Sequence, residues 1–149
     1  MKGYVTLKRG RESRARSGHP WVYAGEIAEI RGGPSEGDVV DVLTAGAGFI
    51  GRGLINTQSQ ITVRILTWAD ERVDDDWFVR KLGEAIEYRR TIAPGVRSLR
   101  LVHSEGDSLP GLIIDAYDDC LVFQFLTLGM DMRRDIIIDL AARCADQVF

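Results

Sequence analysis

Residues 38–66 read DVVDVLTAGAGFIGRGLINTQSQITVRIL, and this stretch sets the architecture of the first half of the chain. Three β-rich runs, at 38–43, 49–56 and 61–66, are separated by turns rich in glycine and small polar residues. The last run alternates apolar and polar residues with a period of two, which is typical of a strand with one buried face. Short strands at close spacing with glycine turns predict a small β-barrel.

Shorter elements precede these strands. Residues 4–7 read as a strand, residues 11–17 as a polar stretch compatible with a helix, and residues 27–30 as a further strand end. Pro20 disfavours helix at the residue before it and permits a new turn beginning at Trp21. We expect the barrel to occupy residues 1–68, with its last strand ending near Thr67.

The second half predicts a different order of elements. An acidic segment ends in carboxylates that suit a helix start, and a helix is expected from Trp77 to about Ile92. Strands are expected at 99–103, 111–115 and 120–126. A final helix capped by Asp131 would bury one face, formed by Ile137, Leu140, Ala141, Cys144 and Val148. The fold class is therefore α+β, with a barrel followed by a domain at 70–149 in helix–three strands–helix order.

Positive charge is concentrated at the N-terminus of a chain whose net charge is −3. Residues 1–20 hold six basic side chains and one acidic one, giving +5, whereas residues 69–149 hold ten basic and sixteen acidic ones, giving −6. Arginine guanidinium groups form bidentate hydrogen bonds to phosphates. The basic cluster therefore predicts contact with the backbone of RNA, the alternative being a solvated face. Its members are Lys8, Arg9, Arg11, Arg14 and Arg16.

Aromatic and histidine side chains follow the basic cluster directly. An aromatic beside a basic patch can stack on an unpaired base, but Trp21 and Tyr23 are expected to fill the mouth of the barrel. His19 is the better candidate for a base contact, and Arg64 on the last strand is a further candidate for RNA binding. Residues 46–51 match G-x-G-x-x-G, yet β-like sequence follows, so we expect a hairpin turn rather than a dinucleotide site.

Carboxylates and cysteines offer alternatives to RNA binding. Glu105, Asp107 and Asp115 could hold a divalent metal for hydrolysis, or they could accept backbone hydrogen bonds in a tight turn. A zinc site is not expected, because histidines at ligand spacing are missing. Cys120 and Cys144 lie in apolar patterns and are expected to be core residues. They form no disulfide pattern, and no apolar run approaches the roughly 20 residues of a membrane helix, so a cytoplasmic protein is expected.

Two stretches resemble the RlmI-type large-subunit rRNA 5-methylcytosine methyltransferases. The first comprises KRGRE at 8–12, GHPWVYAGEI at 18–27 and GDVVDV at 37–42, and it looks like the family's N-terminal PUA domain, an RNA-binding barrel. The second, RLVHSEGDSLPGLIIDAY at 100–117, is similar to the family's central domain. Neither stretch resembles the family's Rossmann-like methyltransferase domain, with its S-adenosylmethionine loop and catalytic cysteine.

The resemblance implies an RNA-binding portion of an rRNA (cytosine-5) methyltransferase, truncated before its catalytic domain. It implies ribosomal RNA as partner and S-adenosylmethionine as cofactor of the full-length protein, with no cofactor or catalytic residue in this chain. Two alternatives stay open beside the metal-dependent hydrolase. The chain could be a stand-alone RNA-binding or assembly module, or its second half could form the interface of a homodimer.

Overall fold

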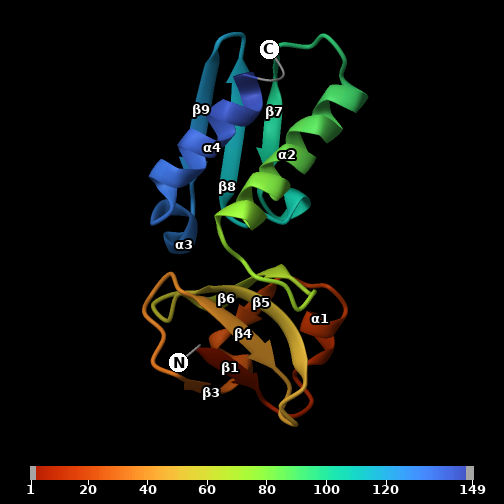
Figure 1. The fold of residues 1–149 in the computed structure, drawn as a ribbon. Coiled ribbons are helices and arrows are strands. Elements are labelled where there is room, and N and C mark those ends of the chain that lie inside the picture. The colour runs from red at the N-terminus through yellow and green to blue at the C-terminus, as the bar shows by residue number, and fades with distance from the viewer. Residues whose placement is uncertain (1–2, 147–149) are drawn as a thin grey trace. The chain divides into compact units, whose positions relative to one another are not determined.

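The computed structural model describes residues 3–146, and the chain divides into two compact units, Met1–Glu71 and Arg72–Phe149 (Figure 1). The first unit is rich in strands, and the second has a helix, three strands and further helices in that order. The α+β class predicted from the sequence is confirmed. Val148, expected on a helix face, lies outside the described residues.

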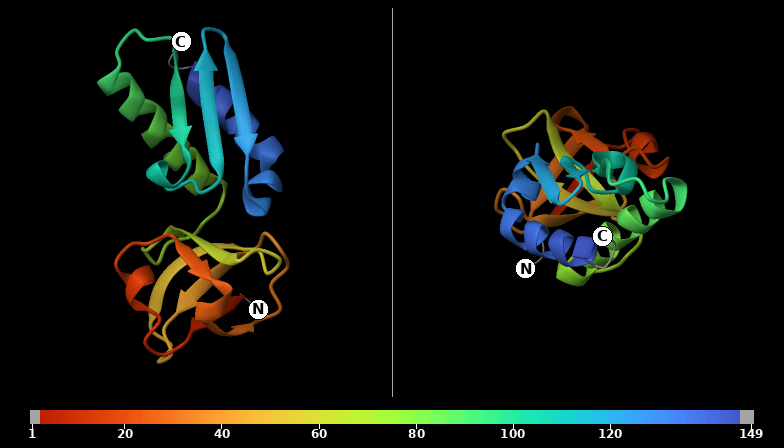
Figure 2. Two further views of the ribbon diagram at one scale, coloured as in Figure 1. Left: turned by 180° about the vertical axis from the view of Figure 1, so that it is seen from behind. Right: turned by 90° about the horizontal axis from the view of Figure 1, so that it is seen from above.

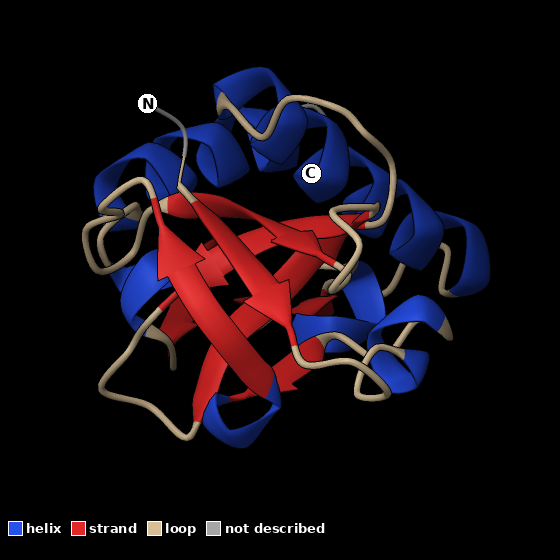
Figure 3. Cartoon of the chain, turned by 90° about the horizontal axis from the view of Figure 1, so that it is seen from below, coloured by secondary structure: helices blue, strands red, loops and turns tan. Residues whose placement is uncertain are grey.

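The first unit is a six-stranded sheet in the order β2-β6-β5-β4-β1-β3. The strands are antiparallel except for the pair β1–β4, which is parallel. Figure 3 looks onto this unit and shows its strands crossing one another steeply as the sheet curls. The elements are β1 (Tyr4–Leu7), α1 (Ser13–Arg16), β2 (Trp21–Tyr23), the 3-10 turn η1 (Ala24–Glu26), β3 (Ile27–Arg31), β4 (Val39–Leu43), β5 (Phe49–Ile55) and β6 (Ile61–Thr67).

The curl brings together the two ends of the sheet. Strands β2 and β3 stand at opposite ends of the strand order, yet only the three residues of η1 separate them in the chain. The sheet must therefore bend back on itself so that its first and last strands can be neighbours. Pro20 permitted a new turn beginning at Trp21, but the structure forms a strand there, and Trp21 and Val22 pair with Arg64 and Val63 of β6.

Glycines in β5 let β6 approach unusually closely. A Cβ atom built on Gly53 would lie 2.2 Å from the carbonyl oxygen of Arg64, and one on Gly51 would lie 2.8 Å from that of Thr67. No larger residue fits at either position without backbone movement. The β5–β6 register shifts between Arg52 and Gly53, and a shift of this kind increases local twist. The interior formed by the curl is filled by fully buried aliphatic side chains, including Val5, Val40, Val42 and Val63.

The G-x-G-x-x-G run forms a hairpin turn between β4 and β5, as expected. The amide of Thr44 donates to the carbonyl oxygen of Gly48 at 2.8 Å, and the Gly48 amide donates to the Thr44 hydroxyl at 2.9 Å. Ala47 adopts a positive φ of 63° within this turn. The chain after the turn is strand β5 rather than a helix, so no helix N-terminus is available to receive a phosphate.

Arg52 is a buried cation in the middle of β5. Its Nε donates to Asp41 on β4 at 2.5 Å, its Nη2 to Asp70 at 2.9 Å, and its Nη1 to the carbonyl oxygen of Glu71. The hydrogen bond to Asp41 is the main reason that the pKa of Arg52 is raised above its ordinary value. One guanidinium thus joins two strands to the segment that leaves the barrel after β6.

The second unit contains a three-stranded antiparallel sheet in the order β7-β8-β9. In Figures 1 and 2, α2 and α4 lie on the same face of this sheet, and no described helix of the unit covers the other face. None of the described helices is long and apolar enough to span a membrane. The elements are α2 (Asp75–Ile92), β7 (Ser98–His103), the 3-10 turn η2 (Ser104–Asp107), β8 (Leu112–Tyr117), β9 (Cys120–Phe125), α3 (Leu128–Asp131) and α4 (Arg134–Asp146).

Local signals placed the first helix of this unit better than the last. Asp74 is the N-cap of α2, and its carboxylate accepts from the amide of Trp77 at 3.2 Å. Asp131 does not cap α4, because it ends the short helix α3 and accepts a hydrogen bond from Arg134. Cys120 is exposed at the β8–β9 turn, so the prediction that it is a core residue was wrong. Burial raises the pKa of the Cys144 thiol.

We predict that Arg52→Ala lowers the free energy of unfolding of the first unit by about 3 kcal/mol, the lower end of the range for breaking a buried ion pair. The side chain of Arg52 is only 7% exposed, so its loss removes hydrogen bonds that water cannot easily replace. Urea unfolding followed by tryptophan fluorescence measures the change. Arg31→Ala is the control, because the Arg31–Glu29 pair is exposed and its loss should change little. Equal effects of the two substitutions would contradict the structural role of Arg52.

Candidate nucleic-acid interface

The basic cluster lies on α1 and on the loop before it, and this segment is held against the barrel. Glu12 accepts hydrogen bonds from the amides of Gly10 at 2.8 Å and Ala45 at 3.4 Å. Ala15 is buried, and its carbonyl oxygen accepts from the indole Nε1 of Trp68 at 2.7 Å. The cluster is therefore presented on a fixed backbone, which reduces the entropy lost when a ligand binds.

Arg14 is the most extensively bonded member of the cluster. Its guanidinium lies 3.4 Å from a carboxylate oxygen of Glu26, 3.3 Å from Nδ1 of His19 and 5.0 Å from the centre of the Tyr23 ring. Glu26 also accepts from the amide of Tyr23 at 2.8 Å. This network joins α1, β2 and η1, so Arg14 holds the interface in shape as well as adding charge to it.

Three other arginines of the cluster are exposed, namely Arg9, Arg11 and Arg16. Within residues 3–146 they form no ion pair. The helix begins at Ser13, so Arg11 lies before it, although residues 11–17 were considered compatible with a helix from the sequence. Lys8 is exposed and donates from Nζ to the carbonyl oxygen of Gly25 at 2.9 Å.

The sheet brings Arg64 alongside the aromatic end of this region. Arg64 on β6 is the register partner of Trp21 on β2. The rings of His19 and Trp21 meet edge to face at 5.7 Å, and Nδ1 of His19 accepts from the Trp21 amide at 3.2 Å. Trp21 and Tyr23 are half-buried. The residues predicted for RNA binding thus lie on α1 with its flanking loops and on the neighbouring pair β2–β6.

The carboxylates of the second unit are engaged by arginines rather than grouped for a metal. Asp107 makes a bidentate pair with Arg89, at 2.6 and 2.8 Å, and Asp115 makes another with Arg100, at 2.8 and 3.1 Å. Glu105 accepts from the hydroxyl of Ser104. Among the described residues, no group of three His, Cys, Asp or Glu side chains could hold a metal ion.

The residues that support the interface were not found from the sequence. Glu12 and Glu26 stand among basic residues and would be taken for charge-balancing surface groups, but each accepts backbone hydrogen bonds that fix the loop. The indole of Trp68 reaches Ala15, which is 53 residues away in the chain. One feature of the sequence could have pointed to such a supporting residue: Glu12 is an acidic residue within a basic cluster, where it is unexpected.

Residues 5–68 match a family model described as a PUA-like domain. Fold and sequence therefore identify the first unit as a PUA-like domain.

Curated relatives match almost the whole chain. Ribosomal RNA large subunit methyltransferase I of Shewanella denitrificans is 39% identical over 139 residues, which cover 91% of this chain and 35% of that protein. The protein of the same name from Aliivibrio fischeri strain MJ11 is 34% identical over 143 residues, which cover 94% of this chain and 36% of its own length. The resemblance predicted from the sequence is confirmed over almost the whole chain, and the chain spans about a third of the length of the relatives that it matches.

Solved structures share the fold. A candidate SAM-dependent methyltransferase from Streptococcus mutans superposes with a TM-score of 0.82 over 98% of this chain and 38% of that chain, at 17% identity. A second, a candidate methyltransferase complexed with SAH, gives a TM-score of 0.83 at the same identity and coverage. In our chain the glycine-rich run enters strand β5, and Asp107 and Asp115 are each paired with an arginine.

We predict that the pKa of Glu12 lies below the ordinary glutamate value, because its own amide and the amides of Ala45 and Gly10 donate to the carboxylate. A lowered folded-state pKa stabilises the fold above the unfolded-state pKa, and this stabilisation is lost as the pH falls through the folded value. The stability difference between the parent chain and Glu12→Gln should therefore shrink in acid. NMR titration of the carboxyl carbon gives the pKa directly, and an unshifted or raised value would contradict the assignment.

Proposed function

We propose that this chain is the RNA-binding part of a SAM-dependent ribosomal RNA (cytosine-5) methyltransferase. The observation that carries the proposal is the set of exposed arginines on α1 and the loop before it in a PUA-like domain, namely Arg9, Arg11 and Arg16. Because they have no ion pair to break within the described residues, their guanidinium groups can bind phosphates directly. The names of the relatives point to ribosomal RNA as the binding partner.

The interface combines two kinds of contact. Exposed guanidinium groups bind phosphates and fix the position of the RNA without reading its sequence. His19 and the exposed part of Trp21, next to Arg64, offer a ring edge and a cation to an unpaired base beside that backbone. Lys8 and Arg14 add positive charge, while their hydrogen bonds hold η1 and β2 in place. RNA would be bound in one orientation by this arrangement.

Methyl transfer itself is assigned to a part of the protein outside this sequence. Cys120 is exposed at a hairpin turn, and burial raises the pKa of the Cys144 thiol, which disfavours its reactive thiolate. The bound SAM would likewise be held outside residues 1–149. The chain by itself would then position the RNA, with the second unit, Arg72–Phe149, connecting the RNA-binding unit to the catalytic part.

We predict that the chain binds fragments of large-subunit ribosomal RNA with an affinity that falls steeply as salt increases, because counterions are released from the phosphates. Arg9→Gln/Arg11→Gln should weaken binding at least fivefold at low salt and reduce the slope of log K against log salt by about one per lost contact. Fluorescence anisotropy at 50 and 200 mM salt measures both quantities.

The matched control is Arg31→Gln/Arg72→Gln, which removes the same charge from exposed arginines outside the cluster. Its affinity should stay within twofold of that of the parent chain. Equal weakening by the two double variants would show that net charge alone governs binding. Absence of binding at low salt would refute the RNA-binding role altogether.

A further inference from the structure

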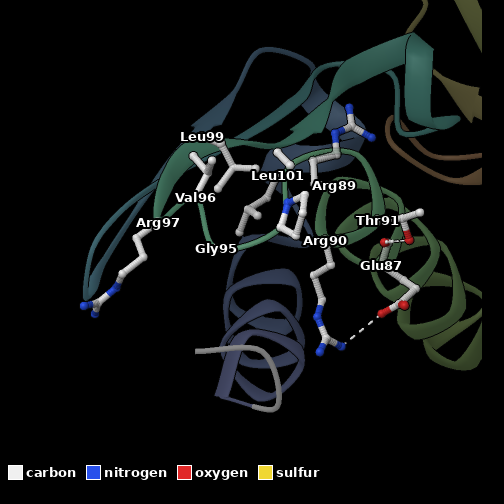
Figure 4. A pocket seen from close by; sticks show the side chains of 11 residues that line it. Glu87, Arg89, Arg90, Thr91, Gly95, Val96, Arg97, Leu99 and Leu101 are labelled. Atoms are coloured by element: carbon white, nitrogen blue, oxygen red, sulfur yellow. Dashed lines mark hydrogen bonds and ion pairs between the residues drawn. The ribbon is translucent and has the colours of Figure 1, made fainter.

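The second unit contains a pocket that the proposed RNA interface does not use. It has a volume of about 500 Å³ and lies between the last turn of α2, the loop at 93–97 and the start of β7. Its apolar wall is formed by Val96, Leu99 and Leu101, which Figure 4 shows side by side. A pocket of this size, with an apolar wall and a few polar groups at its edge, has the dimensions of a small-ligand site.

Arginines surround this pocket within an otherwise acidic unit. Three of the ten basic residues at 69–149 line it, and the one acidic lining residue is Glu87. Figure 4 shows the guanidinium of Arg89 directed away from those of Arg90 and Arg97. The rim therefore carries several guanidinium groups, each with a carboxylate partner, and whether an anionic ligand can reach them depends on how firmly those pairs are held.

The three arginines differ in how firmly they are held. Arg89 makes a bidentate pair with Asp107, and both side chains are almost buried, at 13% and 10% exposed, so this arginine forms part of the wall. Arg90 pairs with Glu87, and Arg97 with Asp118 at 3.5 Å, in ion pairs whose side chains are all about half exposed or more. Exposed pairs of this kind contribute little free energy. A phosphate can therefore compete for Arg90 and Arg97.

The main chain adds hydrogen-bond acceptors. Arg90 and Thr91 belong to the last turn of α2, where carbonyl oxygens have no amide partner further along the helix. An anion alone gains nothing from carbonyl oxygens, whereas a nucleobase carries N–H donors that can bind them. The apolar wall and the carbonyl acceptors together match a nucleobase, and the arginines of the rim match its phosphates.

We propose that this pocket binds a single unpaired nucleotide of an RNA strand. The base lies against Val96, Leu99 and Leu101, and the phosphates on either side of it are bound by Arg90 and Arg97, which Figure 4 shows pointing in different directions. An arginine plane beside an apolar wall is a common platform for unstacked bases. That the nucleotide comes from RNA rests on the proposed function, but the pocket can be tested separately from the basic cluster of the first unit.

The test is an NMR titration of the ¹⁵N-labelled chain with three probes: UMP, hexauridylate and a hexaglutamate peptide. Hexauridylate should shift the amide resonances of Val96, Arg97 and Leu99 and should bind more tightly than UMP. Arg90→Gln/Arg97→Gln should weaken hexauridylate binding at these resonances at least fivefold. Arg134→Gln/Arg143→Gln, which removes the same charge from exposed positions on α4, should leave it within twofold.

Val96→Asp provides a second variant, since Val96 is 48% exposed and a carboxylate there repels phosphate without disturbing the core. It too should weaken binding at the pocket. The proposal fails if 10 mM hexauridylate does not shift the pocket resonances, if UMP binds there as tightly as the hexamer, or if hexaglutamate shifts them instead. If hexauridylate shifts the pocket resonances but not those of residues 8–20, the proposed function of the first unit is refuted and the pocket assignment stands.

Discussion

The close approach of β5 and β6 at Gly53 is the constraint on which the first unit depends. A Cβ atom there would lie 2.2 Å from the Arg64 carbonyl oxygen, so the two backbones can meet only because this residue has no side chain. The adjacent register shift twists the pair, and the sheet curls until β2 and β3 are joined by the three residues of η1. That closure places α1 and its loops beside β2 and β6. The positions of the exposed arginines therefore follow from a glycine elsewhere in the sheet.

Arginines serve two purposes in this protein, and their partners distinguish the two. Arg52 and Arg89 are largely buried, and each is fixed by a carboxylate on a neighbouring element. They join segments, because a guanidinium can donate several hydrogen bonds in one plane. Arg9 and Arg11 are exposed, without an ion pair among the described residues, and stand on a backbone held by Glu12. The first kind of arginine supports the fold, and the second kind is available to a ligand.

The two units differ in fold and in charge: residues 1–71 carry +1, and residues 72–149 carry −4. Residues 1–20 carry +5, whereas residues 69–149 carry −6. Much of the acidity in the second unit is compensated internally, through pairs such as Arg100–Asp115 across two strands. An acidic surface around a few local cations restricts where a polyanion can bind. The pocket beside α2 places exposed arginines in a unit whose net negative charge would otherwise repel RNA.

Local sequence predicted most of the helices and strands, but few of the contacts that hold them together. The alternation at 61–66, the glycine turn at 44–48 and the carboxylates before α2 are short-range signals, and the strands, hairpin and helix that they predict are present. The basic cluster was equally visible as a run of residues.

Short-range signals could not show that Trp21 begins a strand, because its partner Arg64 lies 43 residues later in the chain. They could not separate Arg14, which is bonded to Glu26, His19 and Tyr23, from Arg11, which is not, since that difference arises from packing. The pocket beside α2 likewise exists only because the helix end, its following loop and β7 meet in space. Composition and periodicity thus determined the kind of protein, and tertiary contacts decided which of its charged side chains are free to bind a ligand.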